Sequence, residues 1–174
     1  MTEFEFGGFS CRAEGSGGTL ALLFSGFDRE LFADVGGILA QSCGGVTLAE
    51  FGDIDWDRDY SPWEAAGTNG RVFSGGADRL VGFLPDIVQE LSRRYGEFSR
   101  VYLCGYSLGG LFALYSAAVW DFPALCGAAS CSGSMWFPGW TEFLSEHPIH
   151  GDVFLSLGGK EEKAKNKVMA AVGD

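Results

Sequence analysis

The 174-residue sequence contains only two histidines, His147 and His150, and no apolar run as long as a membrane-spanning helix requires. It is also poor in basic residues: 12 lysines and arginines stand against 23 aspartates and glutamates, which gives a formal net charge of −11. Nucleic acids and anionic membranes are bound by clustered lysine and arginine, so the composition argues against both as partners. We attribute the acidity to a well-solvated surface.

Paired cysteine motifs are also missing. The sequence has five cysteines and no Cys-x-x-Cys, and scattered cysteines of this kind are typical of small buried residues in a reducing compartment. Residues 3–6 alternate glutamate with phenylalanine, and the first six residues lack the basic and apolar regions of a secretory signal. We therefore expect no signal peptide and a cytoplasmic location.

The remaining composition is that of a folded domain, with 47% apolar and 20% charged residues, and the length suggests a single domain over residues 1–174. Continuous apolar runs are typical of strands buried on both faces of a parallel sheet, and here they alternate with helical stretches. This order predicts an α/β fold with a mostly parallel, doubly wound sheet. Strands are expected at 3–14, 19–24, 46–51, 101–104, 124–130 and 153–157, helices at 30–43, 80–95, about 108–120 and 136–146, and a loop at 53–75.

The segment around Ser107 carries the most chemical information. It reads Gly105-Tyr106-Ser107-Leu108-Gly109-Gly110, after an apolar strand-like run and before a run of helix formers. This Gly-x-Ser-x-Gly pattern is typical of a nucleophile elbow, in which the serine lies on a strained turn between strand and helix. The glycines leave room for the turn, and the first N–H groups of the helix lie where an oxyanion would develop. We predict that Ser107 is a nucleophile.

Chance is the alternative explanation of the motif, because glycine makes up 27 of the 174 residues. The flanking strand and helix supply the context that the motif requires. Other candidate residues also follow predicted strands, and ligands of open α/β sheets bind at the carboxyl ends of the strands. We therefore favour the elbow.

Three further segments accompany the elbow: Asp55 to Trp63, Ser130 to Trp136, and Leu155 to Glu162. Together the four resemble the α/β hydrolases and, more narrowly, small bacterial esterases related to esterase D and enterochelin esterase. The resemblance covers most of the chain. It implies a three-layer α/β hydrolase-like domain and a catalytic triad in the chain order serine, acid, histidine.

The resemblance places the acid a few residues beyond the strand at 153–157. Glu161, three residues after Gly158, fits this position, and Glu162 is the second candidate. The structural alternative for both glutamates is a solvated helix start, where acidic residues interact favourably with the helix dipole.

The resemblance also places the histidine after one further strand, whereas His147 and His150 both precede the strand that bears the acid. We therefore expect a C-terminally truncated form of the fold, with the catalytic histidine absent from this chain. Both histidines are then solvated loop residues. The alternative, that one of them acts as the base from an unusual position, stays open because a triad is defined by its geometry.

For the oxyanion hole, the resemblance implies the N–H of Leu108 and a second N–H from Gly26 or Phe27. Aromatic side chains around the predicted site are candidates for binding an acyl or alcohol group: Trp56, Tyr60, Trp63, Tyr106 and Trp136. An alternative for the tryptophans is that they cover the edge of the sheet.

Acidic residues at 53, 55, 57, 59 and 64 have the offsets of a calcium-binding loop. Such a loop needs glycine at its sixth position, where this chain has Arg58, and it follows a helix, whereas the segment before residue 53 is predicted to be a strand. We predict the lip of a pocket here and no metal site, and no feature of the sequence calls for a cofactor.

Two functions follow from these observations. The first is a serine hydrolase that acts on a small ester or thioester through Ser107, Glu161 and a histidine that this chain lacks. The second is a hydrolase-fold protein without catalytic activity that binds a ligand or partner in the same pocket. The missing histidine favours the second, because a serine without a base is a weak nucleophile.

Overall fold

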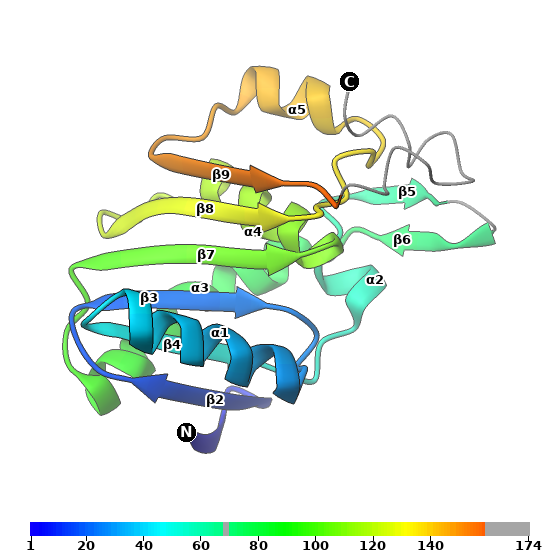
Figure 1. Ribbon diagram of the computed structural model, residues 1–174. Helices are drawn as coiled ribbons and strands as arrows, with labels where there is room; N and C mark the ends of the chain where they lie inside the picture. Colours follow the sequence, from blue (N-terminus) through cyan, green and yellow to red (C-terminus); the bar gives the residue numbers. More distant parts are fainter. Residues whose placement is uncertain (68–69, 159–174) are drawn as a thin grey trace.

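The structure is a computed structural model, and it describes residues 1–67 and 70–158. Within them a seven-stranded sheet has the order β1-β2-β4-β3-β7-β8-β9 (Figure 1). The bounds of its strands are β1 (Thr2–Phe6), β2 (Phe9–Gly15), β3 (Thr19–Phe24), β4 (Val46–Phe51), β7 (Arg100–Tyr106), β8 (Leu125–Cys131) and β9 (Asp152–Ser156).

Strands β4, β3, β7, β8 and β9 are all parallel, which confirms the mostly parallel sheet expected from the sequence. The amino-terminal part differs from the expectation of one edge strand over 3–14. It forms the antiparallel hairpin β1–β2, and β2 pairs antiparallel with β4. Gly7 and Gly8, with φ of 59° and 84°, make the turn between the two strands, and consecutive residues with positive φ are typical of tight hairpins.

Helices cover both faces of the sheet. Helix α1 (Arg29–Ser42) lies on one face, and α3 (Ala77–Tyr95) and α4 (Leu108–Val119) lie on the other (Figure 1). The alternation of side chains along β3 explains both contacts, because Ala21 and Leu23 pack under α1, whereas Leu20, Leu22 and Phe24 belong to the core with α3 and α4. The three layers are those of an α/β hydrolase-like domain.

Helix α3 begins earlier than expected and continues through Pro85 without a break. Pro85 is exposed, so the missing N–H does not leave an unpaired group in the core. Arg93 and Arg94 in the last turn both pair with the buried Glu90, at 2.9 and 2.6 Å, and Gly96 ends the helix with a φ of 97°.

The segment 53–75, expected as a loop, contains the single helical turn α2 (Trp56–Asp59) and the short hairpin of β5 (Glu64–Ala66) and β6 (Val72–Ser74). Asp55 caps α2 by accepting the N–H of Arg58 at 3.1 Å. Residues 68 and 69, between the two hairpin strands, lie outside the described part of the chain.

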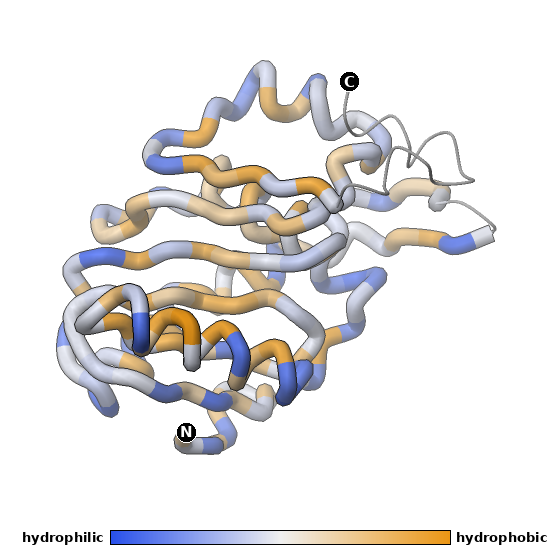
Figure 2. The backbone as a smooth tube through the Cα atoms, in the orientation of Figure 1, coloured by the Kyte–Doolittle hydropathy of each residue, from blue (hydrophilic) through white to orange (hydrophobic). Residues whose placement is uncertain are grey.

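Among the parallel strands of the described residues, β9 is the most exposed. Val153, Phe154 and Leu155 are 46%, 60% and 58% exposed, and Figure 2 shows the hydrophobic residues along this strand. The short helix α5 (Trp140–Glu146), which precedes β9 in the chain, begins four residues later than expected. No helix in the described ranges has the length and apolarity needed to cross a membrane.

All five cysteines are free thiols, and only part of the expected burial is found. Burial raises the pKa of Cys11 to about 12 and that of Cys104 to about 11. Cys43 and Cys131 are instead exposed, because Cys43 follows the end of α1 and Cys131 ends β8 at the sheet edge.

Candidate active site

Ser107 occupies a turn between a strand and a helix. Strand β7 ends at Tyr106 and α4 begins at Leu108, and Ser107 between them has a φ of 54° and a ψ of −121°. This conformation is unfavourable for a residue with a side chain, and it persists only where its surroundings hold it. Here the N–H of Ser107 donates to the carbonyl oxygen of Cys131 at 3.0 Å, and its own carbonyl oxygen accepts the N–H of Ser134 at 3.1 Å.

The glycines around Ser107 are required by close contacts. A Cβ on Gly105 would overlap the carbonyl group of Gly109, and a Cβ on Gly109 would overlap the carbonyl oxygen of Phe24. On Gly110, a Cβ would lie 2.5 Å from the hydroxyl oxygen of Ser130, on the neighbouring strand β8. The elbow therefore packs against the ends of β3 and β8 with no space for additional side-chain atoms.

The amino end of α4 points its first N–H groups toward the turn that carries Ser107. The N–H groups of a helix's first turn have no intrahelical acceptors, and they carry the positive end of the helix dipole. The first turn of α4 contains no acidic residue that would neutralise this end. The N–H of Leu108, the first residue of the helix, is therefore well suited to stabilise negative charge beside Ser107.

Four strands end side by side at the edge where Ser107 lies. Phe24 pairs with Gly105, Tyr106 pairs with Cys131, and Cys131 pairs with Ser156, so β3, β7, β8 and β9 all point to the same edge (Figure 1). The segments that follow these strands meet there, as expected for the ligand-binding edge of an open α/β sheet.

The turn after β3 brings Gly26 and Phe27 to this edge with positive φ values of 81° and 66°. The N–H of Phe27 donates to a carboxylate oxygen of Glu50 at 2.8 Å. This bond removes Phe27 from the two alternatives for the second oxyanion donor, because its N–H already has an anionic acceptor. Gly26 is the remaining candidate.

Two of the five predicted aromatic residues lie next to these groups. Trp56 packs on the turn: a Cβ on Gly26 would lie 2.9 Å from its ring. Tyr106 directly precedes Ser107, and its side chain is 52% exposed. Trp136 is half-buried, with its ring centroid 6.1 Å from that of Phe73, in the segment after β8.

Tyr60 and Trp63 differ from the expectation that they face a ligand. Tyr60 is 0% exposed and lies in the core. Its ring centroid is 5.1 Å from that of Trp56 and 5.1 Å from that of Phe112, so Trp56 packs on the core through Tyr60. Trp63 packs against Phe143 of α5 at 5.3 Å, and its indole N–H donates to the carbonyl oxygen of Pro138. The tryptophan therefore joins the segment 53–75 to α5 and the segment that precedes it.

The acidic residues of segment 53–59 each have a partner within the protein. Asp53 accepts from Ser10, Asp55 caps α2, and Asp57 pairs with Arg71. The buried Asp59 accepts from Arg58 at 2.9 Å and from Arg79 at 3.1 Å. Burial by itself would raise the pKa of Asp59, but these bonds and the N–H of Asp55 outweigh burial and lower it.

Comparison with solved structures identifies the architecture. An IroE-like serine hydrolase from Shewanella oneidensis has a TM-score of 0.72 at 18% identity, and the match covers 84% of this chain and 55% of that one. The siderophore hydrolase EstA from Aspergillus nidulans has a TM-score of 0.68 at 19% identity, with 91% of this chain and 67% of that one covered. The enterobactin esterase FES from Shigella flexneri has a TM-score of 0.66 at 16% identity, with 95% and 46% covered.

The chain has an α/β-hydrolase fold. At these identities the likeness concerns the fold, and it confirms the architecture implied by the sequence resemblance. No protein-family model matches the sequence, and no curated protein matches it. The chain spans 55% of the length of the Shewanella structure.

Within this fold, β9 is the strand that leads to the predicted acid. Its last residue, Ser156, accepts the N–H of Ser132 at 2.7 Å, which fixes the end of β9 beside the segment after β8. The chain thus leaves β9 at the same edge as Ser107. Glu161, predicted as the acid, and Glu162, its alternative, lie outside the described residues.

The two histidines flank the connection from α5 to β9. His150 precedes the amino end of β9, which starts at Asp152 and runs parallel to β7, whereas Ser107 follows the carboxyl end of β7. His147 ends α5, with its ring stacked on Phe143 at a centroid distance of 4.3 Å. His150 is therefore at the sheet edge opposite Ser107, whereas the contact of His147 is with its own helix.

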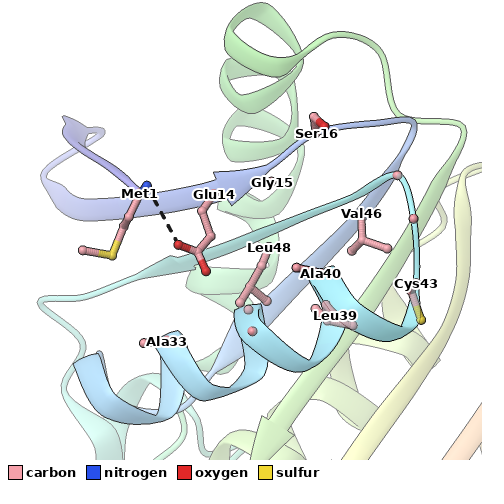
Figure 3. Close-up of a pocket in the computed structure, with 14 residues that line it drawn as sticks. Met1, Glu14, Gly15, Ser16, Ala33, Leu39, Ala40, Cys43, Val46 and Leu48 are labelled. Atoms are coloured by element: carbon pink, nitrogen blue, oxygen red, sulfur yellow. Dashed lines mark ion pairs between the residues drawn. The ribbon is translucent and has the colours of Figure 1, made fainter.

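A cavity of about 660 Å³ also lies away from Ser107 (Figure 3). It is lined by residues of α1 and by the adjoining ends of β2 and β4, at the amino edge of the parallel strands, and Glu14 within it pairs with the amino terminus of Met1 at 3.9 Å. None of the predicted site residues lines it.

One charged pair near the site, Arg12 with Glu50, was not predicted from the sequence. Arg12 and Glu50 are both fully buried and form an ion pair beneath the turn that contains Phe27. A signal was present, since Glu50 is the single charge in the otherwise largely apolar β4, and Arg12 in β2 carries the opposite charge.

Proposed function

We propose that the chain is the nucleophile-bearing part of a serine hydrolase that acts on small esters or thioesters. The observation that carries this proposal is the strained turn at Ser107, held between the end of β7 and the amino end of α4. The names of the fold neighbours, a serine hydrolase, a siderophore hydrolase and an enterobactin esterase, are in accord with ester hydrolysis.

In this mechanism the hydroxyl oxygen of Ser107 attacks the carbonyl carbon of the ester while a histidine takes its proton. The carbonyl oxygen becomes an oxyanion, stabilised by the N–H groups of Leu108 and Gly26. Collapse of the intermediate expels the alcohol or thiol, which receives the proton from the histidine, and water then hydrolyses the acyl-enzyme by the same steps. Glu161 orients this histidine, which in the proposal is neither His147 nor His150.

Substrate contacts in this proposal come from Trp56 beside Gly26, Tyr106 beside Ser107, and Trp136 after β8. Two observations support this choice: the Trp56 ring packs on Gly26, and Tyr106, which precedes Ser107, is exposed. The partner is therefore a small molecule, with no cofactor and no part for nucleic acid or membrane. We propose a cytoplasmic location, in keeping with the unpaired cysteines.

The second candidate is a hydrolase-fold protein that binds a ligand without turning it over. The position of His150, before the amino end of β9 and so at the sheet edge opposite Ser107, favours it, as does the stacking of the His147 ring on Phe143 of its own helix. A triad without its base loses about 10⁶-fold in rate, so the two candidates differ by a measurable margin.

The test uses the full-length product of the gene, a p-nitrophenyl ester and a fluorophosphonate probe. The hydrolase proposal expects ester turnover and covalent labelling at Ser107, both lost in Ser107→Ala. Ser99→Ala is the matched control, because Ser99 is an exposed serine at the opposite edge, and it should retain both. Absence of turnover and labelling in a folded wild-type protein would overturn the hydrolase proposal and favour the binding protein.

A further inference from the structure

Arg12 and Glu50 form an ion pair in the middle of the protein. The two residues face each other across the antiparallel pairing of β2 with β4, and both side chains are fully buried beneath α1. Arg12 donates to one oxygen of the Glu50 carboxylate, Oε2, from Nε at 2.9 Å and from Nη2 at 2.5 Å. This contact uses only one of the two carboxylate oxygens.

The other oxygen, Oε1, is bonded to the turn after β3. It accepts the backbone N–H of Phe27 at 2.8 Å and the hydroxyl of Ser25. One carboxylate therefore binds both ends of the three-residue turn that contains Gly26. Hydrogen bonds to an ionised acceptor are stronger than those between neutral groups, so the Glu50 carboxylate binds the turn more strongly than a neutral acceptor would.

Arg12 contacts the same turn through the side chain of Phe27. Its guanidinium carbon lies 4.1 Å from the centroid of the Phe27 ring, a distance typical of a cation–π contact. The Phe27 ring also packs on Gly52, where a Cβ would lie 2.7 Å from it. Phe27 is thus fixed through its backbone by Glu50 and through its side chain by Arg12.

A turn with positive φ at both Gly26 and Phe27 needs such support, because Phe27 is not a glycine and its left-handed conformation is unfavourable. Stability alone does not account for the charges, since a buried ion pair is on average no more stabilising than apolar residues of the same volume. What an apolar pair cannot supply is an acceptor for the Phe27 N–H and the Ser25 hydroxyl.

We propose that Glu50, with Arg12 as its counterion, is a positioning residue that holds the Ser25–Phe27 turn so that the Gly26 N–H faces the oxyanion. The role in catalysis rests on the proposed hydrolase function. Three contacts carry the proposal: the two bonds of Glu50 Oε1 and the ring contact of Arg12.

Two double variants of the full-length protein separate this role from a structural one. Arg12→Met with Glu50→Gln removes both charges but keeps an acceptor oxygen near the Phe27 N–H. Arg12→Met with Glu50→Leu removes the charges and the acceptor together. Neither leaves an unpaired buried charge, so both are expected to fold. Glu3→Gln with Arg29→Met, at an exposed ion pair 2.7 Å long, is the matched surface control.

Two measurements are made on each variant: hydrogen exchange of the Phe27 amide by NMR, and kcat and KM for a p-nitrophenyl ester. In the Met/Leu variant we expect Phe27 exchange to be at least about 10-fold faster, and kcat to fall by up to about 10²-fold, the effect of losing one oxyanion donor, with KM nearly unchanged. The Met/Gln variant should keep most of both properties, and the surface control should match wild type.

Equal exchange and equal kcat in the two buried double variants would overturn the proposal, because the acceptor oxygen would then make no difference. The exchange measurement does not depend on catalysis. The wild type could show no ester turnover while the Phe27 amide still exchanges at different rates in the two variants. That result would contradict the hydrolase function and would support the role of Glu50 in fixing the turn.

Discussion

The backbone of Gly109 lies against the carbonyl oxygen of Phe24, with no room for a Cβ between them. Phe24 ends β3, and Gly109 belongs to the first turn of α4, so this contact joins the predicted oxyanion turn to the helix of the nucleophile elbow. The pairing of Phe24 with Gly105 makes the same connection through the sheet. The two donors expected around an oxyanion are therefore carried by backbone segments that are packed together.

This contact predicts the effect of adding a single methyl group. Gly109→Ala should lower the free energy of unfolding by about 1–3 kcal/mol, the cost of inserting an atom into a fully packed site. Gly82→Ala is the matched control, since Gly82 lies in the interior of α3 with nothing near its Cβ position. It should raise the free energy of unfolding by about 0.5–1 kcal/mol, because alanine is the better helix former. Urea unfolding measures both, and equal shifts would contradict the contact.

The strain at Ser107 predicts a gain in stability from a substitution that removes the nucleophile. Glycine adopts the backbone conformation of Ser107 without steric cost, so Ser107→Gly should raise the free energy of unfolding by about 1 kcal/mol. Labelling by a fluorophosphonate should disappear at the same time. Ser92→Gly, in the regular helix α3, should instead lower stability by about 0.5 kcal/mol. A loss of stability in Ser107→Gly would show that the turn is not strained.

Asp59 predicts part of the acid sensitivity of the protein. Its lowered pKa means that the folded state binds a proton less readily than the unfolded state, so its contribution is complete at neutral pH. That contribution is lost as the pH falls below the ordinary aspartate pKa of 3.8 toward the lower pKa of the folded state. Asp59→Asn should therefore lower stability at pH 7 by about 2 kcal/mol, the value of hydrogen bonds to a charged group, and reduce the loss on acidification.

The control for this prediction is Asp34→Asn, because Asp34 is an exposed carboxylate on α1. Urea unfolding at several pH values between about 2 and 7 gives the comparison. If Asp59→Asn and wild type lose stability in parallel as the pH falls, the ion pairs of Asp59 with Arg58 and Arg79 do not contribute as stated.

The elements of the sheet could be predicted because their signals are local. The apolar run at 46–51 became β4 with the same bounds, and the Gly-x-Ser-x-Gly pattern specifies a turn that only glycines permit on either side of Ser107. The segment 53–75 was harder, since the three-residue strands β5 and β6 are too short to show a period. The alternation of element types predicted a mostly parallel sheet, but it did not give the order of the strands in space.

The support beneath the site could not be predicted, because it depends on contacts between distant parts of the chain. Arg12 and Glu50 are 38 positions apart, and only the pairing of β2 with β4 brings them together. Likewise, the sequence gives Phe27 and Gly26 as equal candidates for the oxyanion donor. The bond from Phe27 to Glu50 separates them, and it depends on the same strand pairing.

The positions of His147 and His150 give the sharpest test of how the site is completed. His150 lies just before the amino end of β9, and a five-residue strand spans about 17 Å, well beyond the reach of an imidazole that must contact Ser107. The ring of His147 is stacked on Phe143 of α5. His147→Ala and His150→Ala, singly and together, should therefore leave kcat and KM of the full-length protein for a p-nitrophenyl ester within about twofold of wild type. The 174-residue chain alone should show little turnover, because it contains no other histidine. Turnover by that chain at the rate of the full-length protein, lost in His147→Ala or His150→Ala, would instead make one of these two residues the base and place it beside Ser107.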